Sequence, residues 1–129
     1  GQQTSVASSD PDYATITAAV NEAISHIVAS SDFGPSETTV AEYRQSFAIE
    51  VFYDQPLQIH SRFNLGRPRQ IMVPLTGTGY TEGRFFIGAD GAYHAAGPIT
   101  KGLSPVRTAV AAALSRRGVA PPTASQPPR

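Results

Sequence analysis

Apolar and polar residues alternate through the middle of this chain, and the alternation predicts β-strands. In residues 42–53 the positions on one face are Tyr43, Gln45, Phe47, Ile49, Val51 and Tyr53. A period of two is typical of a half-buried strand. The pattern resumes in residues 57–63, after the turn-forming triplet Asp54-Gln55-Pro56, and again in residues 69–75. We therefore expect a long strand, a hairpin and a third strand.

A second hairpin is expected around Asp90 and Gly91. This dipeptide is preferred in two-residue type I′ turns, where both residues need positive φ angles. Residues 84–89 should then pair with residues 92–96. Between the two hairpins, residues 77–83 read GTGYTEG. They are rich in glycine and precede a strand, so we expect a loop here and not a phosphate cradle, which needs a following helix.

Helices are expected at both ends of this pattern. Asp10 is suited to cap a helix and Pro11 to its first position, and apolar residues then recur at helical spacing at Tyr13, Ile16, Val20, Ile24 and Ile27. This pattern predicts a helix over residues 11–29. A second helix should begin with Ser104 as its cap and Pro105 as its first residue, and Gly118 should end it.

The predicted order is an N-terminal helix, a curved antiparallel sheet of about five strands, and a C-terminal helix. Packed in two layers, this is an α+β fold. The element order resembles that of the cystatin-like and NTF2-like scaffolds, in which a long helix is cradled by a curved antiparallel sheet. The C-terminal helix departs from a simple cystatin-like order, and a likeness of order lends no functional residues.

Composition divides the chain into three zones. Residues 1–9 are a polar head, residues 10–118 carry the pattern of a single α+β domain, and residues 119–129 are a proline-rich tail. A tail of this composition is expected to be extended, as a linker or a docking arm. A chain of 129 residues is long enough to bury one core.

Charge and cysteine content exclude several classes of function. Ten basic and ten acidic residues give a formal net charge of zero, which removes long-range attraction to polyanions and favours self-association. The absence of cysteine excludes disulfides, thiolate zinc sites and cysteine nucleophiles. With no run of 18 apolar residues and no signal-peptide pattern at its start, the chain is expected to be soluble and to lack a membrane span. The compartment stays open.

Candidate catalytic residues are few. His26, His60 and His94 stand in no motif that specifies their neighbours, and the aspartates are explained by helix caps and turns. Glu50 and Glu82 remain without a partner that would tune their acidity. We therefore expect no enzyme, no cofactor and no metal site, with a loop-borne site around Glu82, His60 and His94 as the enzymatic alternative.

An arginine cluster is the strongest candidate for anion binding. His60, Arg62, Arg67 and Arg69 lie close together in the sequence, and Arg and aromatic side chains on a sheet can bind single-stranded nucleic acid. Arginine on exposed strands also protects sheet edges from aggregation, and Glu50 is placed to neutralise Arg62 across the first hairpin.

The sequence favours a non-enzymatic binding or assembly domain that acts through protein–protein contacts with a partner or with its own copies. The expected contact residues are outward-facing aromatic side chains and prolines of the tail, namely Phe52, Phe85, Pro121 and Pro122. The alternative is a self-assembling coat or scaffold subunit whose arginine-rich sheet surface binds single-stranded nucleic acid.

Overall fold

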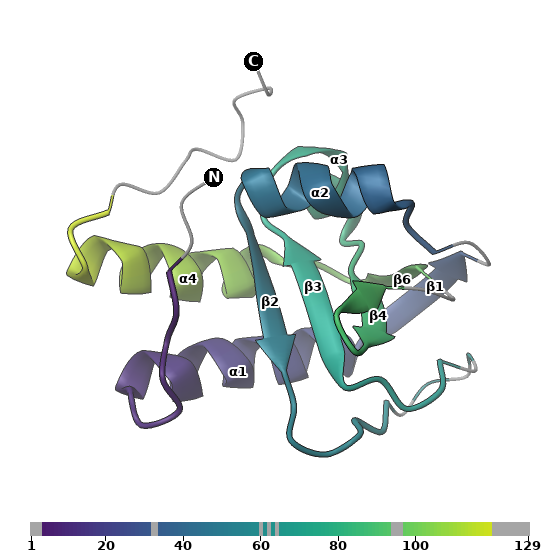
Figure 1. The fold of residues 1–129 in the computed structure, drawn as a ribbon, viewed down its shortest axis with the longest axis horizontal. Helices are drawn as coiled ribbons and strands as arrows, with labels where there is room; N and C mark the ends of the chain where they lie inside the picture. The colour runs from purple at the N-terminus through teal and green to yellow at the C-terminus, as the bar shows by residue number, and fades with distance from the viewer. Residues whose placement is uncertain are drawn as a thin grey trace.

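The computed structural model describes residues 4–31, 34–59, 61, 63, 65–93 and 97–119 of the chain. These residues form four helices and two antiparallel sheets, with a helix before and a helix after the strands (Figure 1). The α+β class predicted from the sequence is confirmed. The strands, however, divide between a four-stranded and a two-stranded sheet.

The larger sheet has the strand order β2-β3-β4-β5, formed by Ala48–Phe52, Gln70–Pro74, Phe86–Ala89 and Ala92–Tyr93. Its register brings Val51 opposite Ile71 and Ile71 opposite Ile87. The smaller sheet pairs β1 with β6, which are Ile27–Ser31 and Gly97–Thr100.

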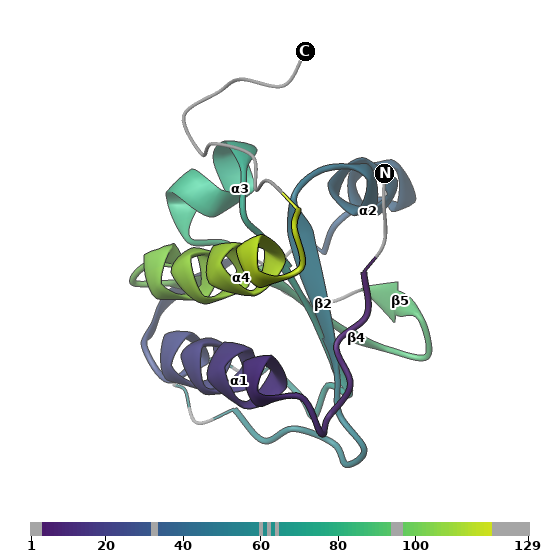
Figure 2. The ribbon, with the colours of Figure 1, turned by 90° about the vertical axis from the view of Figure 1, so that its left-hand side faces the viewer.

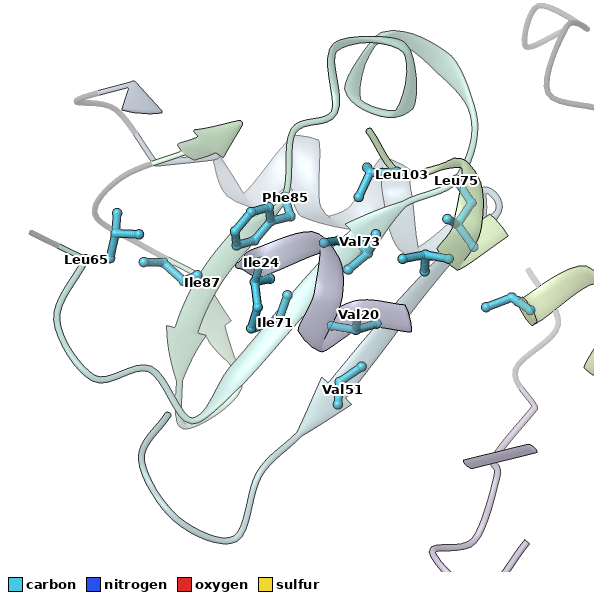
Figure 3. Close-up of a cluster of buried hydrophobic side chains, with 13 residues drawn as sticks. Val20, Ile24, Val51, Leu65, Ile71, Val73, Leu75, Phe85, Ile87 and Leu103 are labelled. Carbon is cyan, nitrogen blue, oxygen red and sulfur yellow. The ribbon is translucent and has the colours of Figure 1, made fainter. Parts of the chain in front are cut away.

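Two helices cover one face of the larger sheet. These are α1 (Pro11–Ile24) and α4 (Ser104–Arg116), which lie side by side in Figures 1 and 2. Their inward residues meet one face of the sheet in the main core (Figure 3). That core is built from Val20, Ala23, Ile24, Val51, Leu65, Ile71, Val73, Leu75, Phe85, Ile87, Leu103, Val106 and Val110.

A shorter helix, α2 (Glu37–Gln45), packs on the opposite face of the sheet (Figure 2). Its Val40 and Tyr43 contact Met72 and Phe86, and the Tyr43 and Phe86 rings are 5.7 Å apart. The strand predicted over residues 42–53 therefore starts later. The overlooked signals are Ser36, whose Oγ accepts the Thr39 amide at 3.1 Å, and the spacing of three between Val40 and Tyr43.

The first hairpin prediction is wrong. The described residues from 53 to 69 contain no strand, and β2 pairs with β3 instead. Leu57 donates its amide to Pro68 O at 2.7 Å, but Pro56 and Pro68 have no amide hydrogen of their own. Each proline therefore removes one donor that a regular ladder in this connection would use.

The second hairpin is confirmed at its turn but is shorter than predicted, since Arg84 bridges Ile99 of β6 and residues 94–96 lie outside the described residues. Asp90 and Gly91 have φ angles of 56° and 83°, and the register pairs Ala89 with Ala92 and Gly88 with Tyr93. Both turn residues thus have the positive φ that a type I′ turn requires.

The glycine-rich segment expected to be a loop forms the short helix α3 (Gly77–Glu82). Gly79 permits this, because a Cβ there would lie 2.5 Å from the Tyr43 hydroxyl and 3.0 Å from the Pro74 ring. Close packing of the backbone, which the sequence pattern does not report, sets this conformation.

The first helix begins as predicted and ends earlier. Asp10 caps it, with Oδ1 accepting the Asp12 amide at 2.8 Å, and Pro11 is its first residue. The helix stops at Ile24 and the chain enters β1 at Ile27. At the other end, Ser104 is the first residue of α4 and Leu103 the residue before it, so the predicted serine cap is wrong. Gly118 has a φ of 73°, as expected after a helix end.

Among the residues that the structure describes, no helix is both long enough and apolar enough to cross a membrane.

Candidate functional site

Strand β2 forms one edge of the larger sheet and is the candidate contact surface. Its neighbour on the inner side is β3, and no strand lies on its outer side within the described residues. Leu75 donates its amide to Phe47 O and Tyr53 donates its amide to Arg69 O, both at 2.9 Å. Because antiparallel hydrogen bonding alternates along a strand, residues 47, 49, 51 and 53 point their backbone groups toward β3.

The backbone groups of Ala48, Glu50 and Phe52 consequently point away from the sheet. None of these outward amide and carbonyl groups has a hydrogen-bond partner in the described parts of the chain. Unpaired edge groups are a template for pairing with another extended chain. We call this row of outward groups, together with the Phe52 side chain, the β2 edge.

Phe52 is the most exposed large apolar side chain of the described residues, with 61% of its surface in contact with solvent. It lies on the same face as Gln70, its partner in the register, and this is the face that carries α2. Helix α2 crosses the start of β2, whereas Phe52 is the last residue of the strand (Figure 1). The end of the strand is therefore left uncovered.

Glu50 is the only charged residue of β2, and two groups hold it. Arg44 Nη2 donates to Glu50 Oε1 at 3.0 Å, and the Tyr93 hydroxyl donates to the same oxygen at 2.8 Å. The hydrogen bond with Glu50 raises the pKa of Arg44. Burial raises the pKa of Tyr93 above its ordinary value, so its hydroxyl stays protonated and remains a donor.

The polar network extends to the second hairpin. Arg44 lies 6.0 Å from the centre of the Tyr93 ring, and Gln70 Oε1 accepts the Gly91 amide at 2.8 Å. Sequence reasoning missed Tyr93 and Gln70. The type I′ register would have placed Tyr93 opposite Gly88, where no side chain obstructs the ring.

The predicted arginine cluster is only partly described. Arg67 and Arg69 are exposed, and Arg69 Nη2 donates to Asp54 O at 2.9 Å. His60 and Arg62 lie outside the described residues, as does the expected pairing of Arg62 with Glu50. The neighbouring arginines do not join the cluster, since Arg44 binds Glu50 and Arg84 binds Glu82 at 3.2 Å.

The predicted contact residues have different outcomes. Phe52 is exposed as expected, but outward exposure of Phe85 is wrong, because its side chain is completely buried in the main core. Phe85 is two residues before Ile87 and lies on the same face of the sheet, which α1 and α4 cover, whereas Phe86 faces α2. Pro121 and Pro122 lie outside the described residues.

The residues of the enzymatic alternative are only partly described. Glu82 is paired with Arg84, and His26 lies 2.9 Å from Glu22 on the exposed side of the chain. His60 and His94 are outside the described residues. Within the described residues, no group of three or more His, Cys, Asp or Glu side chains is placed to hold a metal ion.

A second ionic cluster joins the two long helices. Asp12 forms ion pairs with Arg116 and with Arg117. Arg117 Nη1 lies 2.6 Å from Asp12 Oδ2, and Arg117 Nη2 lies 2.7 Å from Asp10 Oδ2. Hydrogen bonds from Arg116 and Arg117 lower the pKa of Asp12. This cluster links the start of α1 to the end of α4 and is structural.

Comparison with protein-family models, with curated proteins and with solved structures finds no match to the chain. The fold class and the geometry of the β2 edge are therefore the basis for a functional proposal.

Proposed function

We propose that this chain is a non-enzymatic binding domain that acts through protein–protein contacts, and that the β2 edge is its contact surface. The observation that carries the proposal is the combination of an exposed aromatic side chain, Phe52, with unpaired backbone groups along one strand. Addition of a strand to such an edge uses main-chain hydrogen bonds for affinity and side-chain contacts for selectivity.

The chemistry of this edge matches an extended polypeptide. Its donors and acceptors repeat at alternate residues, which is the spacing at which a second strand presents its own groups. Burying the exposed part of an aromatic ring contributes on the order of 1–2 kcal/mol. A partner strand with an apolar side chain near Phe52 would form the main-chain hydrogen bonds and would also bury the Phe52 ring.

The edge also lacks the usual protection against pairing. Natural edge strands carry charged side chains, proline or bulges that discourage association. The sole charge in β2 belongs to Glu50, which is already bound by Arg44 and Tyr93. No residue from Ala48 to Phe52 is proline.

Selection of peptides from a random displayed library on the immobilised wild-type chain tests this proposal. The expected binders are extended peptides with alternating apolar residues, and Phe52→Ser should weaken them at least tenfold, which corresponds to about 1.4 kcal/mol. Val28→Ser is the matched control, because Val28 is the other large apolar side chain exposed in the described region, at 52%. Peptides that bind the Phe52→Ser chain as well as the wild type would contradict the proposal.

A second candidate is a coat or scaffold subunit that binds single-stranded nucleic acid. It is supported by the exposed guanidinium groups of Arg67 and Arg69, which precede β3 at the same end of the sheet as Phe52. Binding of a fluorescent single-stranded oligonucleotide at low and high salt tests it. The expected result is tight binding at low salt that Arg67→Ala with Arg69→Ala weakens, and no binding at low salt would reject it.

A further inference from the structure

We infer that the strand that pairs with the β2 edge is β2 of a second copy of this chain, so that two four-stranded sheets join across a two-fold axis. This inference rests on the proposed function and names its partner. A two-fold axis perpendicular to a sheet makes the two edge strands antiparallel and keeps α2 of both copies on the same side.

The backbone of β2 is complementary to itself in this arrangement. Ala48, Glu50 and Phe52 all point their amide and carbonyl groups outward. In an antiparallel pair, residues with outward groups stand opposite one another and exchange two hydrogen bonds. Three symmetric registers satisfy this condition near the middle of the strand, centred on Ile49, on Glu50 and on Val51. The register centred on Ile49 would place Phe52 opposite Ser46, which ends α2 and lies outside β2, so the exposed ring would have no strand residue opposite it.

Side-chain chemistry selects the register centred on Val51. A centre at Glu50 would place two carboxylates directly opposite each other, and like charges in that position are destabilising. A centre at Val51 instead places Phe52 opposite Glu50 of the second copy, on the face where Arg44 binds that carboxylate. The Arg44 side chain is 44% exposed, so the incoming ring can contact it.

Charge does not oppose this association. The chain has a formal net charge of zero, so two copies do not repel one another at long range. The charge of Glu50 is compensated within each copy by Arg44 at 3.0 Å. A neutral edge that carries one exposed aromatic ring fits another neutral edge of the same kind.

Residues 4–9 of the head lie near this edge. They run downward to the start of α1 on the β2 side of the molecule in Figures 1 and 2. They form no hydrogen bond with β2. The edge groups are therefore not satisfied by the head, and a chain that lacks residues 1–9 should dimerise at least as strongly as the full chain.

Light scattering coupled to size exclusion over a concentration series tests the inference on the full chain. We expect the mass to rise with concentration from the 13.6 kDa of one chain to twice that value. Phe52→Ser should raise the dimer Kd at least tenfold, and the control Val28→Ser should leave it unchanged. In hydrogen–deuterium exchange of the wild type, the amides of Glu50 and Phe52 should become protected as the concentration rises.

A mass of one chain up to about 1 mM would overturn the inference, since that limit corresponds to only weak association. A dimer that persists in Phe52→Ser, or that disappears when residues 1–9 are removed, would overturn it as well, because the contact would then lie elsewhere. Exchange protection is measured on the wild type, so it decides the question even if a variant does not fold.

Single cysteines test the register, because the chain has no cysteine of its own. Residues that face their own copy across the axis lie within disulfide range, with Cα atoms about 4.5–5.5 Å apart. Under mild oxidation, Val51→Cys should form a covalent dimer, whereas Ile49→Cys, on the same face of β2, should not, because residue 49 faces its own copy only in the register centred on Ile49. The reverse result would overturn the register.

Different results would reject the proposed binding function and the proposed pairing of two copies. Peptide strands that bind at Phe52 to a chain that remains a monomer would preserve the binding function and reject self-pairing. Loss of both peptide binding and dimer formation would reject both.

Discussion

The Tyr93 hydroxyl donates a 2.8 Å hydrogen bond to Glu50 Oε1 and so connects the two outermost strands of the larger sheet. Glu50 belongs to β2 and Tyr93 to β5, with β3 and β4 between them. The ring of Tyr93 reaches across because Gly88, its neighbour in the register, has no side chain. This bond holds the only charge of the β2 edge in place.

Removal of the Tyr93 hydroxyl should destabilise the fold. Tyr93→Phe leaves Glu50 Oε1 without its buried donor, and a hydrogen bond to a charged group contributes about 1–3 kcal/mol. Urea denaturation should show a fall of this size in the free energy of unfolding. Tyr53→Phe is the matched control, because the Tyr53 hydroxyl is buried without a hydrogen-bond partner in the described chain. That variant should be neutral or slightly more stable, and equal losses in both would contradict the assigned role.

Two glycines with the same backbone conformation should respond differently to alanine. Gly77 and Gly83 have φ angles of 73° and 75°, so alanine at either position costs about 1–2 kcal/mol from conformation alone. A Cβ at Gly83 would also lie 2.4 Å from Thr100 O. A Cβ at Gly77 would have no described atom within 4 Å. We expect Gly83→Ala to cost about 1–3 kcal/mol more than Gly77→Ala in thermal or chemical unfolding. Similar losses in the free energy of unfolding for the two variants would show that the backbone near Thr100 can move to accommodate the added Cβ.

The ionic cluster at Asp12 should make stability depend on acid pH. Hydrogen bonds from Arg116 and Arg117 lower the folded-state pKa of Asp12 below its ordinary value of 3.8. As pH falls below 3.8, the unfolded chain takes up this proton first, so the contribution of Asp12 to stability decreases and is lost below the folded-state pKa. Asp12→Asn should therefore be less stable than the wild type at neutral pH, and the gap should close as pH falls through this window.

A control for the Asp12 prediction is Glu37→Gln. Glu37 is also a first-turn carboxylate, on α2, and it has no ion pair among the described residues. Urea denaturation at several pH values should give a clearly smaller gap for this variant at neutral pH. A gap for Asp12→Asn that stays constant down to the most acid pH would contradict the ionic role.

Alanine at Phe85 and alanine at Phe52 should change the free energy of unfolding by different amounts. Phe85→Ala should cost about 3–5 kcal/mol, because it leaves a cavity in the main core at a side chain with 0% exposure. Phe52→Ala should change the free energy of unfolding by less than about 0.5–1 kcal/mol, since most of its ring is exposed. Chemical denaturation of both variants under conditions that keep the chain monomeric checks the contrast. A large loss for Phe52→Ala would assign it to the core and weaken the binding proposal.

Local signals located some elements well. The Asp90-Gly91 turn was predicted because its φ angles follow from the residue types alone. The start of α1 at Pro11 followed from the Asp10 cap in the same way. Both features depend on a few consecutive residues, and for that reason the rest of the fold had little influence on them.

Predictions that relied on alternation over long segments were less accurate. Residues 42–45 fit a strand pattern, yet they complete α2, because Val40 and Tyr43 pack on Met72 and Phe86. Residues 27–29 fit the helical pattern, yet they begin β1, because β6 offers a partner strand. In both cases a contact distant in sequence chose between two locally acceptable structures.

The candidate site was predictable only in part. Phe52 was expected to face outward from the alternation of β2, and it does. The same argument was wrong for Phe85, because it shares a face with Ile87, and that face is covered by α1 and α4. The binding of Glu50 by Arg44 and Tyr93 was not foreseen, since it joins residues that are 6 and 43 positions apart in sequence.

By itself the sequence determined the α+β class, the type I′ turn and the first residue of α1, because hydrophobic periodicity, turn angles and helix caps are properties of neighbouring residues. The tertiary structure alone decided which strands pair, that β2 lies at an edge, and that Phe85 is buried. Those outcomes depend on which distant segments exclude water from one another, and a local pattern is compatible with more than one such arrangement.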